Sequence, residues 1–226
     1  MRNRYFYIII FLFFSCSLVL ANGPIMKSNS EEYLKKLFEY AKSKNVQAVE
    51  NLRSEVVGKP NAILTIGYSL SLYIAAPERY EEQYIDNFPT DFNGIMTILY
   101  NEIELKQLTP TFLYSIDAIG KIALKGNEKA VKKVLIGAGQ SDGAVGEIFC
   151  DYVNQLLYKQ LHKTLAVLLL IDVSERKKSY DCFKLMSQED ILLLKKKIKK
   201  TAPVIEQELQ HIVKEVIQEL NRNNQK

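Results

Sequence analysis

Tryptophan is absent from the sequence and histidine occurs only twice, so residues that often mark ligand or metal sites are scarce. His162 and His211 each stand alone, without cysteine or carboxylate residues at the spacing of a zinc motif. The sequence also contains no H-E-x-x-H zinc helix and no phosphate-binding P-loop. These absences argue against a zinc enzyme and a P-loop hydrolase, and we expect no cofactor, no metal and no catalytic residue.

A strong excess of charge is missing as well. The formal net charge of the chain is +4 at pH 7, and Arg2 and Arg4 supply two of these charges. The near-neutral remainder gives no electrostatic basis for a nucleic-acid partner. We therefore expect no nucleic acid among the ligands.

The first 21 residues have the layout of a secretory signal. Arg2 and Arg4 precede the apolar run 5–14, and small residues at Val19 and Ala21 suit cleavage after position 21. The apolar run is short for a membrane span, which needs ~20 residues. We interpret residues 1–21 as a signal peptide and expect a periplasmic or secreted protein. An uncleaved anchor and a lipid attached to Cys16 are the alternatives.

Cysteine is also rare, since only Cys150 and Cys182 follow the signal segment. In an exported protein a lone pair is a candidate disulfide, because oxidising compartments let such bonds form and persist. Two buried thiols that pack as small hydrophobic side chains are the alternative. Spacing alone does not decide between them.

Apolar residues recur at helical spacing along most of the remaining chain. Residues 61–76 predict a buried helix ended by Pro77, although their alternation also fits a strand. The pair Thr109-Pro110 predicts the start of a helix, since proline at the first helical position costs no hydrogen bond. After a polar leader at 22–30, the pattern predicts a single all-α domain over 31–226, built of antiparallel helix pairs.

Residues 77–92 combine prolines, acids and aromatics between apolar blocks. We interpret them as a surface connection with one helical turn at most, and as a candidate sub-boundary of the domain. A second connection is expected at 137–146. Together the two segments predict a ligand rim formed by Tyr80, Tyr84, Phe88, Gln140, Ser141 and Asp142.

An internal similarity links two segments, 38–52 and 115–135. In each, a helix ends at an asparagine turn, Asn45 or Asn127, and the next helix opens with Ala-Val. Residues 115–135 resemble a HEAT-type helical repeat, and the two turns are separated by about twice the ~40-residue period of that class. The resemblance implies a short HEAT-like α-solenoid or an irregular helical bundle, and it carries no functional residues.

The stretch KVLIGAGQSDGAVG, residues 133–146, imitates a dinucleotide site, with a strand, a glycine turn and a following helix. Its glycines are spaced G-x-G-x-x-x-G, one residue longer than the dinucleotide fingerprint, and Asp172 lies beyond the ~20 residues expected for the ribose-binding acid. Ala130, Val131, Val134 and Leu135 also continue a helical stripe. We favour a mobile connection between two helices.

Five lysines lie within Lys195–Lys200. They could contact anionic lipid as a peripheral membrane site, but we favour a solvated helix face with Leu192–Leu194 and Ile198 in the core.

Tyrosines could line a groove, because tyrosine offers an apolar face and a hydroxyl, or serve as ordinary core aromatics. The tyrosines in question are Tyr68, Tyr73, Tyr80, Tyr84 and Tyr100.

The sequence thus favours an exported, non-catalytic helical module that binds another protein, such as an inhibitor or immunity protein. An exported enzyme such as a cell-wall hydrolase is the first alternative, and nucleotide binding at Gly137–Gly146 is the second. The identity of the partner and the oligomeric state cannot be predicted from these patterns.

Overall fold

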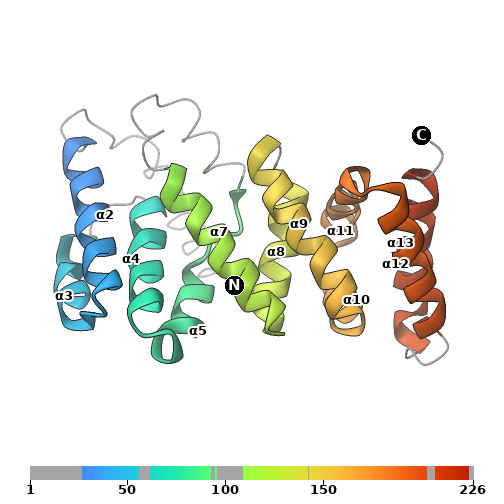
Figure 1. The fold of residues 1–226 in the computed structure, drawn as a ribbon, viewed down its shortest axis with the longest axis horizontal. Coiled ribbons are helices and arrows are strands. Elements are labelled where there is room, and N and C mark those ends of the chain that lie inside the picture. Colours follow the sequence, from blue (N-terminus) through green and yellow to red (C-terminus); the bar gives the residue numbers. More distant parts are fainter. Residues whose placement is uncertain are drawn as a thin grey trace, which may run out of the picture.

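The computed structural model of the chain describes residues 27–55, 62–92, 95, 109–141, 143–202 and 207–223, and every element within them is a helix. The prediction of an all-α protein is confirmed. Figure 1 shows the helices following one another in chain order along the long axis of the molecule. The elements are α2 (Lys27–Lys42), α3 (Val46–Asn51), the 3-10 turn η2 (Leu52–Glu55), α4 (Ala62–Ala75), α5 (Pro77–Asn87), α7 (Thr109–Leu124), α8 (Glu128–Gln140), α9 (Gly143–Lys159), α10 (Leu161–Leu169), α11 (Val173–Ser179), the 3-10 turn η4 (Tyr180–Leu185), α12 (Gln188–Thr201), the 3-10 turn η6 (Gln207–Leu209) and α13 (Gln210–Asn223).

The expected signal peptide at 1–21, with Cys16, lies outside the described residues, as does most of the expected leader at 22–30. Helix α2 begins at Lys27, so the last four residues of that leader belong to the first helix. Within the described part of the chain, no helix is both long and apolar enough to cross a membrane.

The two similar segments form the same turn. The side-chain oxygen of Asn45 accepts a hydrogen bond from the backbone N–H of Ala48 at 3.0 Å, and that of Asn127 accepts one from Ala130 at 3.2 Å. The residue before each asparagine has a positive φ, at Lys44 and Gly126. A residue with positive φ ends one helix, and the asparagine caps the next. The predicted helix starts after both turns are confirmed.

The prediction of a surface connection at 77–92 is wrong, because residues 77–87 form the three-turn helix α5. Pro77 occupies the first turn, where its missing N–H costs nothing. Tyr80, Tyr84 and Phe88 recur every four residues, and all three side chains are buried. The helical spacing of these aromatics is the signal that the flanking prolines obscured.

The prediction of a mobile connection at 137–146 is also wrong, because α8 runs through Gly137 and Gly139 to Gln140, and α9 begins at Gly143. The glycines are needed for close packing rather than for a flexible turn. A Cβ on Gly137 would lie 2.5 Å from the buried ring of Phe149, and one on Gly139 would lie 3.0 Å from the backbone oxygen of Glu175. The strand required by the dinucleotide interpretation is not formed.

Substitution of Gly137 by alanine is expected to lower the free energy of unfolding by about 1–3 kcal/mol. The new methyl group would overlap the fully buried ring of Phe149, so the ring or the helix would have to shift. Urea unfolding measures the effect. Lys132→Ala, on the exposed side of the same helix, is the control and should stay within about 0.5 kcal/mol of wild type. Equal stability of Gly137→Ala and wild type would contradict this packing.

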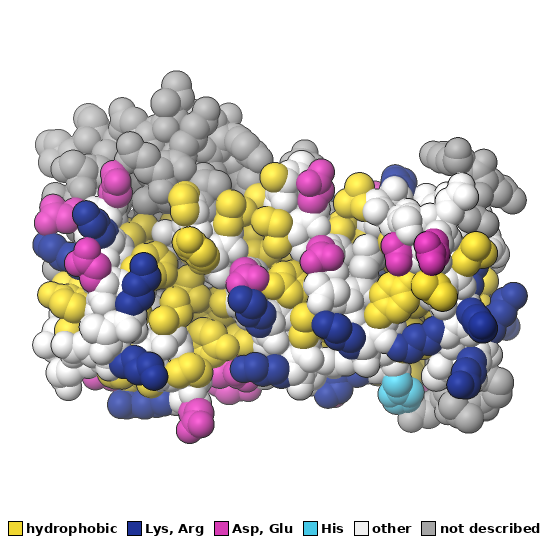
Figure 2. Space-filling model, viewed as in Figure 1, with side chains coloured by type: hydrophobic (Ala, Val, Ile, Leu, Met, Phe, Trp, Pro, Cys, Tyr) yellow, Lys and Arg dark blue, Asp and Glu magenta, His cyan; other side chains and the backbone are white. Residues whose placement is uncertain are grey.

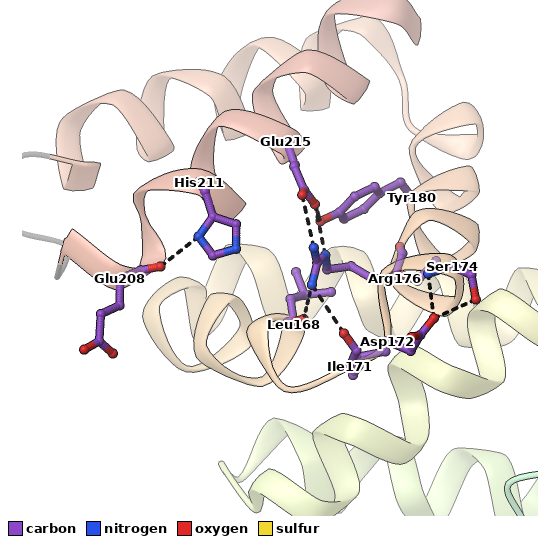
Figure 3. A network of polar contacts seen from close by, with 10 residues as sticks. Leu168, Ile171, Asp172, Ser174, Arg176, Tyr180, Glu208, His211 and Glu215 are labelled. Atoms are coloured by element: carbon purple, nitrogen blue, oxygen red, sulfur yellow. Dashed lines mark hydrogen bonds and ion pairs between the residues drawn. The ribbon is translucent and has the colours of Figure 1, made fainter.

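A buried arginine joins the final helix to the preceding part of the chain (Figure 3). Arg176 on α11 is 4% exposed and forms a paired contact with the Glu215 carboxylate on α13, at 2.9 and 3.0 Å. Its remaining terminal nitrogen donates to the backbone oxygens of Leu168 and Ile171, at the end of α10. The hydroxyl of Tyr180 donates to the same carboxylate at 3.2 Å. Burial opposes ionisation of Glu215, but the hydrogen bonds and charge of Arg176 lower the pKa of that carboxyl.

The sulfur atoms of Cys150 on α9 and Cys182 in η4 are 2.13 Å apart, so the structure forms the candidate disulfide. Both cysteines are buried in the core. The bond links segments separated by 32 residues and fixes η4 against α9. The alternative of two free buried thiols is not what the structure contains.

Helix α12 begins at Gln188, directly after Ser187, whose hydroxyl oxygen accepts a hydrogen bond from the Asp190 backbone N–H at 3.1 Å. Placement of all of Leu192–Leu194 in the core was wrong. Ile191, Leu194 and Ile198 are buried, whereas the side chains of Leu192 and Leu193 are 57% and 50% exposed. The spacing i, i+3, i+7 brings the first three residues to one side of the helix and turns the other two away from it.

Candidate functional site

A hollow of about 490 Å³ lies between α3, α4 and α5, and we call it the α3–α5 groove. Its volume falls within the ~300–1,000 Å³ common for ligand pockets. These three helices and the 3-10 turn η2 supply its walls, and polar side chains predominate among the lining residues. The lining residues are Gln47, Glu50, Asn51, Arg53, Tyr68, Leu72, Tyr80 and Gln83.

Helical spacing explains why these residues meet. On α3, Gln47, Glu50 and Asn51 are three and four residues apart and therefore share one face. The amide of Gln47 donates to the side-chain oxygen of Asn51 at 3.1 Å. On α4, Tyr68 and Leu72 are separated by one turn and are buried, so they form an apolar floor.

The carboxylate of Glu50 is the polar centre of the groove. Its Oε1 atom accepts two hydrogen bonds, one from the Tyr80 hydroxyl and one from the Arg79 guanidinium at 3.3 Å. The Arg79 guanidinium also lies over the Tyr80 ring, 4.9 Å from the ring centroid. Burial raises the pKa of Tyr80, and the hydrogen bond and charge of Glu50 raise it further. At neutral pH the phenol therefore stays protonated and remains a donor to Glu50.

Arg53 is the positive group that the groove leaves available. Its side chain is exposed, and it forms no ion pair with any described residue. Its charge acts on Tyr68, whose pKa is raised by burial against the opposing influence of Arg53. The groove thus combines a tyrosine and leucine floor, amide groups and one available cation at its edge.

Of the predicted rim residues, only Tyr80 lines this groove. Tyr84 and Phe88 lie in the core, where the hydroxyl of Tyr84 donates to the backbone oxygen of Ser115. Burial raises the pKa of Tyr84 well above its usual value, so this phenol remains neutral. Among the other tyrosines considered, Tyr68 lines the groove, Tyr73 stacks on Tyr84, and Tyr100 lies outside the described residues.

The remaining rim residues serve packing where they are described. Gln140 accepts a hydrogen bond from the backbone of Phe92 at 3.2 Å and donates to Glu175 at 2.8 Å, so it joins three segments. Ser141 follows α8, and Asp142 lies outside the described residues. The two predicted rim segments therefore meet through the half-buried side chain of Gln140.

Residues 139–143, GQSDG, also match the G-x-S-x-G spacing of a serine nucleophile elbow. In that motif the serine stands between a strand and a helix. Here Ser141 follows a helix, and its hydroxyl oxygen is buried without a hydrogen-bond partner. Among the described residues, therefore, no base is within hydrogen-bonding contact of this hydroxyl.

A second hollow, of about 240 Å³, lies between α5 and α8. Its charged groups hold the two helices together. The ammonium of Lys129 pairs with Glu82 at 2.9 Å and with Asp86 at 3.2 Å, and the ammonium of Lys133 donates to the backbone oxygen of Phe88. Burial lowers the pKa of Lys133. Lys129 and Lys133 therefore line this hollow because they hold α5 and α8 together.

Sequence reasoning did not identify Gln47, Glu50, Asn51 and Arg53. Their spacing marks one helix face, but a solvated face has the same appearance in a sequence. No group of three or more potential metal ligands occurs among the described residues. Both histidines are exposed, and His211 contacts the backbone oxygen of Glu208 at 2.9 Å.

Comparison of the sequence with protein-family models and with curated proteins, and of the chain with solved structures, gives no match.

Proposed function

We propose that the chain is an exported, non-catalytic protein-binding module of the inhibitor or immunity type, which holds a segment of its partner in the α3–α5 groove. The observation that carries the proposal is the lining of this groove. Its amides, its tyrosine hydroxyls and its apolar floor match the mixed polar and apolar character of a polypeptide segment.

The groove also favours one kind of segment. Side-chain amides such as Gln47 and Gln83 can both donate to a peptide carbonyl and accept from a peptide N–H. Arg53 would pair with an acidic side chain of the partner, because its guanidinium matches a carboxylate and is not already paired within the described residues. We therefore propose a partner segment that combines an acidic residue with an apolar one.

We also propose that the protein is exported from the cytoplasm. The basic, apolar and small-residue layout of 1–21 supports it, and so does the bond between Cys150 and Cys182, since disulfides persist mainly in oxidising compartments. We also propose that the architecture is HEAT-like. The matching asparagine turns at Asn45 and Asn127 support this relationship.

Selection of peptides on the purified protein tests the proposed binding. A random peptide library would be enriched on wild type and depleted on the variant Arg53→Ala/Gln83→Ala. We expect enriched peptides to contain Asp or Glu and to bind wild type. Arg53→Ala should weaken the binding about ten- to a hundredfold, since a charge-assisted hydrogen bond contributes roughly 1.5–3 kcal/mol.

The control is Arg222→Ala, which removes an exposed arginine remote in sequence from the groove. It should leave peptide affinity unchanged. Peptides that bind wild type and Arg53→Ala/Gln83→Ala equally well would place recognition outside the α3–α5 groove. Enrichment of no peptide at all would contradict the proposal directly.

A further inference from the structure

Three of the large hydrophobic side chains that the structure leaves exposed lie close together in sequence, around the start of α12. Leu185, Leu192 and Leu193 are 57%, 57% and 50% exposed. Single exposed leucines are common on protein surfaces, but adjacent ones on one helix form a patch. Figure 2 shows hydrophobic side chains beside Lys and Arg side chains at the α12–α13 end of the molecule.

Lysines extend this leucine patch along the same side of α12. Leu193, Lys196 and Lys200 are spaced i, i+3, i+7, and Leu192, Lys196 and Lys199 are spaced i, i+4, i+7. Both sets therefore form neighbouring rows on the side opposite the buried Ile191, Leu194 and Ile198. All of these row residues are exposed.

The positive charge on this face is not neutralised internally. None of Lys196, Lys199 and Lys200 forms an ion pair with a described residue, whereas Lys197 turns inward and donates to the backbone oxygen of Tyr158. Glu189 is the exposed acid on the helix, and Asp190 accepts a hydrogen bond from the Ser187 hydroxyl at 2.6 Å. Three exposed and unpaired lysines thus outnumber the two carboxylates of the helix, Glu189 and Asp190.

We propose that the outer face of α12 docks on the surface of an anionic phospholipid bilayer. Leucines at the start of the helix would enter the boundary between headgroups and acyl chains. The lysines that follow would extend their ammonium groups to lipid phosphates, while their methylene chains cover apolar surface. This surface is separate from the α3–α5 groove, so the proposal does not depend on the proposed peptide ligand.

The absence of tryptophan allows this face to be probed directly. Leu193→Trp would introduce a single indole into the docking face. On vesicles of phosphatidylglycerol, we expect its fluorescence to shift to shorter wavelength and to be quenched by lipids with brominated acyl chains. Tyr114→Trp, at a side chain 66% exposed on α7, is the matched control and should show neither effect.

Co-sedimentation with the same vesicles tests the charge. Each lysine near an anionic surface strengthens binding about fivefold. The variant Lys196→Gln/Lys199→Gln/Lys200→Gln should therefore bind about a hundredfold more weakly than wild type, while its melting temperature stays unchanged. Binding of wild type should also weaken in high salt. The fluorescence shift of Leu193→Trp should be lost on phosphatidylcholine vesicles.

Three results would overturn the proposal. The first is that anionic lipids with brominated acyl chains do not quench the fluorescence of Leu193→Trp. The second is equal quenching on phosphatidylcholine, which would remove the role of charge. The third is a fluorescence change that requires an added envelope protein and does not occur with vesicles alone, which would make this face a protein interface.

Discussion

Replacement of Arg176 by methionine is expected to lower the free energy of unfolding by about 3–5 kcal/mol, the usual cost of removing one partner from a buried ion pair. The variant leaves the Glu215 carboxylate without its paired donor. It also leaves the backbone oxygens of Leu168 and Ile171 without the arginine that caps the end of α10. Because α13 carries Glu215, we expect this helix to lose its attachment first. Urea unfolding followed by circular dichroism measures the loss.

A second arginine provides the control. Arg222 pairs with Glu219 on α13 at 2.6 Å, but its side chain is 73% exposed. Exposed pairs contribute little, so Arg222→Met should cost less than about 1 kcal/mol. The double variant Arg176→Met/Glu215→Leu should recover part of the loss, because it removes the unpaired charge as well. Similar small costs for Arg176→Met and Arg222→Met would contradict the importance of the buried pair.

Acid should weaken the same contact. The pKa of Glu215 is lowered in the folded protein, so its contribution to stability is present above the ordinary glutamate pKa of about 4.3 and is lost as pH falls through the lowered folded value. The variant Glu215→Gln cannot titrate. Its stability should therefore depend less steeply on pH in the acid range than that of wild type.

Reduction of the Cys150–Cys182 disulfide is expected to lower the free energy of unfolding by about 3–4 kcal/mol. The bond closes a segment whose ends are 32 residues apart, and loop-closure entropy for that length predicts a loss of this size. Both cysteines are buried in the native protein, so the protein should first be unfolded and reduced, then refolded with reductant present. Thermal or urea unfolding compares this sample with the oxidised one.

The double variant Cys150→Ala/Cys182→Ala separates the bond from other effects of reductant. It should be destabilised to a similar extent and should show no further change when reductant is added. Identical unfolding of oxidised and reduced wild type, with two thiols titrated in the unfolded protein before reduction, would contradict the bond.

Local chemistry in the sequence was sufficient to predict the helix starts after Asn45 and Asn127. Asn45, Asn127 and Ser187 each accept a hydrogen bond from a backbone N–H three residues later. Such caps involve only a few consecutive residues, and the sequence contains all of them. The apolar periodicity that follows each cap then extends the helix, which is why the all-α fold could be predicted.

Tertiary packing determined the features that could not be predicted. Gly137 and Gly139 are poor helix formers, and only their contacts with Phe149 and α11 explain why α8 continues through them. The α3–α5 groove could not be predicted for the same reason. Glu50 and Tyr80 are 30 residues apart in sequence, and no local pattern indicates that their side chains meet.

Photo-crosslinking in the producing cell tests whether the α3–α5 groove holds a segment of a partner protein. A photoreactive amino acid would replace Gln83 in the groove or, as a control, Lys132 on the exposed side of α8. We expect a discrete adduct from position 83 that maps to an acidic segment of one exported protein, is lost with Arg53→Ala, and is absent from position 132. No adduct from position 83, or the same adduct from both positions, would contradict it.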